Sequence, residues 1–127
     1  MPKSQRFLPA ERELEILNIL WHLGPSTVRS VNEQMNKRGP TGYTTTLKLM
    51  QIMHEKKLLV RDETTWPHIY EPGIPEERMQ KQLVTDLLEK AFSGSAEKLI
   101  MRALSAKKVP AKELVRIRKM LDEFEGE

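Results

Sequence analysis

Apolar residues recur at helical spacing in successive segments near the start of the chain. In "PAERELEILNILWHLG" the apolar positions form a wide face made by Leu14, Ile16, Leu17, Ile19, Leu20 and Trp21. This pattern predicts a first helix with Pro9 at its first position and Gly24 at its C-terminal cap. A second helix is predicted in "STVRSVNEQMNKRG", where Ser26 suits the N-cap and Gly39 suits the end.

A third helix is predicted from "GYTTTLKLMQIM" to about Lys57. Its core face holds Thr46, Leu49, Met50 and Met53, and its opposite face holds Thr44, Lys48, Gln51 and Glu55. Threonine is a poor helix former because its branched Cβ restricts χ1. Thr44 and Thr45 place hydroxyls beside unpaired backbone N–H groups, which favours a phosphate there, while Thr46 can turn its methyl group to the core. The alternative is that the threonines only cap the helix.

Two short stretches rich in β-forming residues follow, "LLVRDE" and "WPHIYEP", and "TTW" between them can form a loop. The sequence therefore predicts a two-stranded hairpin after three helices, which is the order of a winged helix-turn-helix. We expect a mainly α fold with a small β-hairpin, in which residues 1–72 form a winged-helix DNA-binding domain.

The remaining residues, 73–127, are predicted to form a helical dimerisation domain. One helix starts at Pro75 and ends near Gly94, Ser95 caps the next, and Pro110 starts the last. Their apolar stripes contain Leu83, Leu87, Leu88, Phe92, Leu99, Ile100, Leu104, Leu114, Ile117, Leu121 and Phe124. One thin layer of helices cannot bury all these stripes, so we expect a second copy of the chain to cover them. The alternative is that this region folds back on its own winged helix.

Charge is unevenly distributed along the chain. Residues 28–61 hold seven basic and two acidic side chains, although the whole chain has a net charge of only +3. A basic middle segment suggests a local surface that binds a polyanion. The alternative is a solvated surface of mixed charge. The predicted DNA-binding residues are Lys37, Arg38, Thr44, Thr45, Lys48, Gln51, Arg61 and His68. Double-stranded DNA is therefore the expected partner.

Composition excludes several other functions. The chain has no cysteine, so disulfides, thiol nucleophiles and zinc sites built on cysteine are excluded. Its three histidines show no paired metal-ligand spacing, and no nucleophile–base or acid pair stands out, so we expect neither an enzyme nor a metal or other cofactor. There is no apolar run near 18 residues and no apolar signal-peptide core at the start, so we expect a cytoplasmic protein without membrane insertion.

Four stretches together resemble the BlaI/MecI type of penicillinase repressors, over about residues 8–121. They are "LPAERELEILNILWHLGPSTVRSVNEQM", "GYTTTLKLMQIMHEKKLLVR", "HIYEP" and "FSGSAEKLI". The most specific parts are Leu20-Trp21, the "YTT" of residues 43–45, Tyr70 and Gly94-Ser95. The resemblance implies an N-terminal winged helix, a C-terminal helical dimerisation region, and repression through a palindromic operator bound by a homodimer.

The chain also departs from the pattern of that family. Members often carry an arginine late in the recognition helix where this chain has Ile52, and the usual "KG" is replaced by Lys56-Lys57, so the operator sequence cannot be carried over. The absence of cysteine excludes the copper-responsive branch. Penicillinase repressors are released by cleavage at an Asn-Phe pair, which matches Arg102-Ala103 here, so a regulatory protease with another preference, or another signal, is expected to relieve repression.

A function of a different class fits the same pattern. A winged helix can also serve as a protein–protein interaction adaptor without sequence-specific DNA binding. A mobility-shift titration with increasing salt discriminates the two, because phosphate contacts give a steep dependence of affinity on salt.

Overall fold

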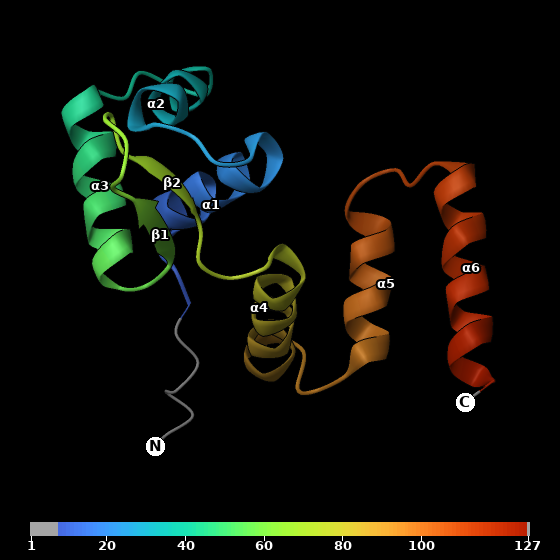
Figure 1. Cartoon of the computed structure of the whole chain (residues 1–127). Helices are drawn as coiled ribbons and strands as arrows, with labels where there is room; N and C mark the ends of the chain where they lie inside the picture. Colours follow the sequence, from blue (N-terminus) through green and yellow to red (C-terminus); the bar gives the residue numbers. More distant parts are fainter. Residues whose placement is uncertain (1–7, 127) are drawn as a thin grey trace. The chain divides into compact units, whose positions relative to one another are not determined.

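The computed structural model of the chain describes residues 8–126; the first seven residues and Glu127 lie outside the described part. In chain order the elements are α1 (Glu11–Leu23), α2 (Val28–Asn36), α3 (Tyr43–Glu55), β1 (Leu59–Asp62), β2 (Ile69–Pro72), α4 (Glu76–Ala91), α5 (Ala96–Ala106) and α6 (Ala111–Glu125) (Figure 1). The chain divides into two units, the first ending at Leu83 and the second starting at Val84. The predicted fold class, a winged helix followed by further helices, is confirmed.

The first helix begins two residues later than the sequence suggested. Its N-cap is Ala10, so the prediction that Pro9 occupies the first helical position is wrong. The Glu13 carboxylate closes this end, because it accepts a hydrogen bond of 3.0 Å from the backbone N–H of Ala10. Glu13 is buried and also pairs with Lys56, whose Nζ lies 2.6 Å from its Oε2. These two partners explain why a carboxylate can lie inside the fold.

The second helix is capped by Thr27 rather than by Ser26. The Thr27 hydroxyl accepts a hydrogen bond of 3.2 Å from the backbone N–H of Ser30. Ser26 instead forms an antiparallel bridge with Tyr70, with N–H to O distances of 2.9 and 2.8 Å. The helix also ends at Asn36, before the predicted Gly39. Ser26 therefore belongs to the small sheet, which extends the hairpin by one bridge.

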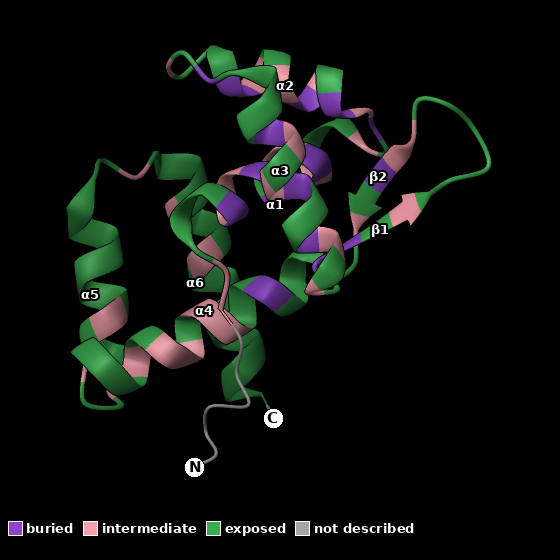
Figure 2. Cartoon of the chain, turned by 90° about the vertical axis from the view of Figure 1, so that its left-hand side faces the viewer, coloured by how far each residue is buried: buried purple, intermediate pink, exposed green. Residues whose placement is uncertain are grey.

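The predicted hairpin is confirmed. β1 and β2 pair in antiparallel register, with Leu59 opposite Pro72 and Arg61 opposite Tyr70. Side chains alternate along the strand pair, so Leu59 and Tyr70 point to the core while Val60 is exposed. The hairpin therefore covers one side of the three-helix core, and its loop extends away from that core as the wing (Figure 2).

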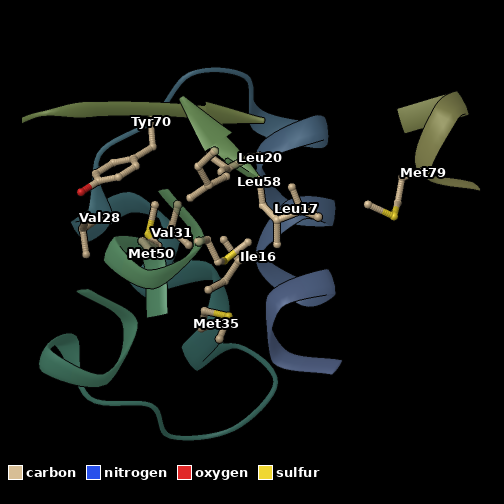
Figure 3. Close-up of a cluster of buried hydrophobic side chains, with 12 residues drawn as sticks. Ile16, Leu17, Leu20, Val28, Val31, Met35, Met50, Leu58, Tyr70 and Met79 are labelled. Atoms are coloured by element: carbon tan, nitrogen blue, oxygen red, sulfur yellow. The ribbon is translucent and has the colours of Figure 1, made fainter. Parts of the chain in front are cut away.

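One core holds the first unit together (Figure 3). The buried apolar side chains are Ile16, Leu17, Leu20, Val28, Val31, Met35, Met50, Met53, Leu58, Leu59, Tyr70 and Met79. Met79 comes from the first half of α4, and the Trp21 indole N–H donates a 3.1 Å hydrogen bond to the carbonyl of Ile74. The first unit therefore extends to Leu83, past the predicted end of the winged-helix domain at residue 72. The functional division between DNA binding and dimerisation at that point stays a prediction.

The second unit contains the end of α4 and the helices α5 and α6. Ser95 caps α5 as predicted, since its hydroxyl accepts a 3.1 Å hydrogen bond from the backbone N–H of Lys98. No residue between 84 and 126 is buried, whereas α1, α2 and α3 each bury several (Figure 2). The helices of this unit are well formed, and the apolar residues of their stripes are half-buried or exposed.

Candidate nucleic-acid interface

A polar network fixes the turn between α2 and α3. The Asn36 side chain accepts a 2.9 Å hydrogen bond from the N–H of Thr41 and donates one of 3.1 Å to the carbonyl of the same residue. The Asn32 amide donates to that carbonyl at 2.9 Å and to the Thr46 hydroxyl at 2.8 Å. Arg12 of α1 donates to the Thr41 hydroxyl at 3.0 Å. Side chains of two helices, α1 and α2, therefore hold the turn before α3 and the first turn of α3 in one orientation.

The two faces of α3 are as predicted. Thr46, Met50 and Met53 are fully buried, and Leu49 packs against the core. The role of Thr46 is more specific than a methyl group facing the core, because its hydroxyl also accepts the Asn32 hydrogen bond. The predicted outer residues Thr44, Thr45, Lys48 and Gln51 are all exposed. The face therefore presents two hydroxyls, an ammonium group and an amide to solvent.

A hollow of about 280 Å³ separates the outer part of α3 from the wing. Its walls are formed by Val28, Tyr43, Leu47, Gln51, Arg61, Trp66, Pro67, His68 and Tyr70. It brings together three of the predicted DNA-binding residues, Gln51, Arg61 and His68, which are distant in sequence. A strand or side chain of a ligand that rests on α3 would therefore also meet the wing.

Arg61 is engaged within the wing. Its guanidinium donates hydrogen bonds to the Tyr70 hydroxyl and to the Glu63 carboxylate, and these acceptors raise the pKa of Arg61. The distance from Arg61 Nε to Glu63 Oε2 is 2.7 Å, and the same contact lowers the pKa of Glu63. An approaching phosphate must compete with this carboxylate for the guanidinium.

The wing carries more acid than α3 does. Next to Glu63, the Asp62 carboxylate accepts hydrogen bonds from the hydroxyl and the backbone N–H of Thr64, at 2.6 and 2.9 Å, and these lower the pKa of Asp62. Both carboxylates are therefore ionised at neutral pH. The outer face of α3, in contrast, has Lys48 as its charged group in the turns that precede Glu55.

Sequence reasoning missed an exposed tryptophan and an aromatic–cation pair. Trp66 in the wing loop is 83% exposed, and its ring forms a T-shaped contact with the His68 ring at a centroid distance of 4.9 Å. At the start of α3, the guanidinium of Arg29 lies 5.8 Å from the centre of the Tyr43 ring. A signal for Trp66 was present, because a tryptophan among polar loop residues has no apolar partner at helical or strand spacing.

Two predicted residues lie elsewhere. Lys37 and Arg38 follow α2 and line a different hollow, of about 270 Å³, together with residues of α1. The Arg38 guanidinium is 3.9 Å from the Glu15 carboxylate of α1. The structure does not bring these two cations to the hollow beside the wing, and their contact with phosphate stays a prediction.

Within residues 8–126 there is no group of three or more potential ligands placed to hold a metal ion. In the same part of the chain, no helix combines the length and the apolar character needed to cross a bilayer.

The sequence profile of the penicillinase repressor family matches residues 9–123. The chain belongs to the penicillinase repressor family. Among its relatives is a protein of Mycobacterium tuberculosis (strain CDC 1551 / Oshkosh) named transcriptional regulator BlaI. It is 29% identical over 128 residues, which cover 99% of this chain and 90% of the relative. A protein of the same name from strain ATCC 25618 / H37Rv matches to the same extent.

A solved structure also resembles this chain in fold. A MarR family protein from Bacillus stearothermophilus superimposes on this chain with a TM-score of 0.52 at 16% identity, covering 96% of this chain and 76% of the other. The likeness supports the winged-helix fold. Membership of the penicillinase repressor family places the chain among transcriptional regulators, which are not a class of enzymes.

Proposed function

We propose that this penicillinase repressor family member represses transcription by binding a palindromic operator as a homodimer. The observation that carries the proposal is the division of α3 into a buried face and an exposed polar face, with its first turn fixed by the Asn32 network. A rigid helix with outward hydroxyl, ammonium and amide groups suits the major groove, which presents hydrogen-bond donors and acceptors in a pattern that differs between base pairs.

The residues on α3 take two roles in this proposal. Thr44 and Thr45 lie in the first turn, where free backbone N–H groups favour a phosphate. Lys48 and Gln51, one to two turns further along, reach base edges: Lys48 binds guanine acceptors and Gln51 binds adenine. The first pair positions the helix, and the second pair selects the sequence.

Arg61 and His68 place the wing on the DNA backbone. Since Arg61 is paired with Glu63, binding exchanges a carboxylate for a phosphate. The wing then contributes affinity without base selection, and Glu63 acts against binding until it moves away. Lys37 and Arg38 would meet phosphates further from the groove that α3 occupies.

The second unit supplies the dimer contact. Leu87, Ile100, Leu121 and Phe124 are 44%, 44%, 52% and 72% exposed, and no residue between 84 and 126 is buried. A second copy would remove this apolar surface from water, which is the main favourable term in association. Dimerisation also links two winged helices, so that the second half-site binds at a high effective concentration.

Repression is relieved by a signal or by proteolysis. The candidate cleavage pair Arg102-Ala103 lies in the middle of α5, and both residues are exposed. Because a protease needs an extended segment, cleavage there requires local unfolding of α5. Full-length protein that persists on immunoblots while target genes are switched on would exclude this route.

A binding-site selection on the full chain tests the assigned roles. Gln51→Ala should relax the choice of base at one position of each half-site, with a loss of roughly 1–3 kcal/mol per bidentate pair. Gln80→Ala on the exposed surface of α4 is the matched control and should select the wild-type site. If Gln51→Ala also selects that site, the base contact is assigned to the wrong residue.

The wing is tested by a pair of opposite changes. Arg61→Ala should weaken binding to all sequences alike. It should also lower the salt slope, which is the slope of log affinity against log salt concentration, by about one unit. Glu63→Gln should strengthen binding, since it removes the carboxylate that holds the Arg61 guanidinium. If the wild-type chain selects no sequence and its affinity for DNA is insensitive to salt, the adaptor function replaces the proposed one.

A further inference from the structure

The C-terminal part of the chain contains a strongly basic segment. Residues 98–119 contain eight basic side chains and one acidic one, Glu113. The preceding residues, 62–97, contain eight acidic and three basic side chains, and residues 120–127 contain four acidic and none basic. Because acidic residues lie on both sides of the segment, the net charge of residues 62–127 as a whole does not reveal it. The segment 98–119 is more basic than residues 28–61, from whose charge a polyanionic partner is predicted.

All eight cations of this segment are exposed: Lys98, Arg102, Lys107, Lys108, Lys112, Arg116, Arg118 and Lys119. Most of them share the polar faces of their helices. On α6, Lys112, Arg116 and Lys119 follow one another at i, i+4 and i+7, which places them on one side of the helix. The apolar stripe of Leu114, Ile117 and Leu121 lies about 165° away from them at 100° per residue.

The other cations of the segment lie on α5 and in the connection between α5 and α6. Lys98 and Arg102 are one turn apart on α5, away from the side that carries Leu99 and Ala103. Lys107 and Lys108 lie between α5 and α6, outside either helix. When the apolar stripes are covered by a second copy, the cations must stay outside the contact, because burying unpaired charges is unfavourable.

We propose that residues 98–119 form a second, sequence-independent DNA-binding surface that holds the phosphate backbone beyond the site contacted by α3. The inference rests on the proposed function, from which it takes the partner and the dimer. Lys112 to Lys119 span about 10 Å of helix, and a duplex carries a charge every 1.7 Å or so along its axis, so each cation can meet a phosphate. An anionic membrane suits the segment less well, since surface helices insert the apolar face that the dimer occupies.

The test uses the full chain and a duplex of random sequence, of about 40 base pairs, titrated between roughly 50 and 200 mM salt. The variant Lys112→Gln/Arg116→Gln/Lys119→Gln is compared with the matched control Arg78→Gln/Lys81→Gln/Lys90→Gln. Both remove three exposed cations, but the control removes them from α4. Each phosphate contact contributes about 0.9 to the salt slope, so the slope of the α6 variant should fall by about 3 units for one engaged copy and about 5 for two. The control should keep the wild-type slope.

Equal slopes for the α6 variant and the wild type would overturn the proposal, and so would equal losses in the α6 variant and the control. If sedimentation shows that the α6 variant no longer assembles, Lys107→Gln/Lys108→Gln decides instead, because these residues lie outside the helices. Its slope should fall by about 2 units for one engaged copy, and an unchanged slope overturns the proposal. Vesicles of phosphatidylglycerol and phosphatidylcholine are the second probe. Loss of vesicle binding with an unchanged duplex slope identifies a membrane surface and overturns the proposal.

The two proposals fail separately. A chain that selects no operator in binding-site selection, but whose duplex slope still depends on residues 112–119, refutes the proposed function and supports the second surface. A chain that selects an operator through Gln51, while its slope is unaffected by the α6 substitutions, refutes only the second surface.

Discussion

The first and second units contain the same kind of amphipathic helix, but the apolar faces of these helices differ in how far they are buried. In α1, Ile16, Leu17 and Leu20 are fully buried within the chain, whereas in α6 Leu121 and Phe124 are 52% and 72% exposed. Both helices carry apolar residues at i, i+3 or i+4. The difference shows that an amphipathic pattern predicts an apolar face but not which surface covers that face.

The energetic consequence is large. Burying a leucine or phenylalanine side chain is worth about 1.5–3 kcal/mol relative to leaving it exposed. In the proposed dimer, the first unit obtains this from its own core, and the second obtains much of it on association. The winged helix is therefore expected to be stable at any protein concentration, whereas the stability of the second unit should depend on protein concentration.

The largest effect is expected when the chain is truncated between the two units. A chain ending at Leu83 should fold and remain monomeric, and its operator affinity should fall by about 10²–10⁴-fold because the two half-sites are no longer linked. Sedimentation and mobility shift measure the two effects.

A chain ending at Pro72 is the matched comparison. It should be less stable than the chain ending at Leu83, since it lacks Met79 and the Ile74 carbonyl that accepts the Trp21 hydrogen bond. Thermal unfolding followed by circular dichroism compares the two. If residues 1–83 form dimers, the association surface lies in the first unit, and its assignment to the second unit is wrong.

A pair of leucine truncations tests the same contrast inside the full chain. Leu17→Ala should lower the free energy of unfolding by about 2–5 kcal/mol, because it opens a cavity in the core of the winged helix. Leu121→Ala should leave the winged helix unchanged and shift the monomer–dimer equilibrium instead. Urea unfolding at two protein concentrations distinguishes them: only the effect of Leu121→Ala should vary with concentration.

The threonines at the start of α3 also differ in burial, so their substitutions should affect different properties. Thr46→Val should cost about 1 kcal/mol of stability, since it leaves a half-buried Asn32 N–H without its acceptor. Thr45→Val is the exposed control, and it should change stability little while weakening DNA binding. The opposite result, with a stable Thr46→Val protein, would mean that the network does not fix α3.

The smallest effect is expected at Lys57, which has a left-handed backbone with φ of 67°. Lys57 is the second lysine of the pair that replaces "KG" in the resembled pattern, and glycine adopts such a φ without strain. Lys57→Gly should therefore stabilise the first unit slightly, by less than about 1 kcal/mol. Lys56→Gly, in the preceding residue, should destabilise it because it also removes the ion pair with Glu13.

Much of the fold could be predicted from the sequence. The three helices, the hairpin, the Ser95 cap and both faces of α3 follow from spacing and capping preference, which depend on residues a few positions apart. The wing could not be predicted at this level. That Arg61 pairs with Glu63 and Tyr70, and that Trp66 borders the same hollow as Gln51, depends on how a loop folds onto a helix.

The order and type of the elements, the family, and the polar character of the outer face of α3 can be read from the sequence, because period and local chemistry encode them. Three features emerge only in the folded chain: Ser26 joins the sheet and leaves the cap to Thr27, Met79 extends the first unit to Leu83, and the helices of the second unit keep their apolar residues half-buried or exposed. These features rest on contacts between residues distant along the chain. No local pattern specifies them, since one amphipathic stripe satisfies the same spacing whichever surface finally covers it.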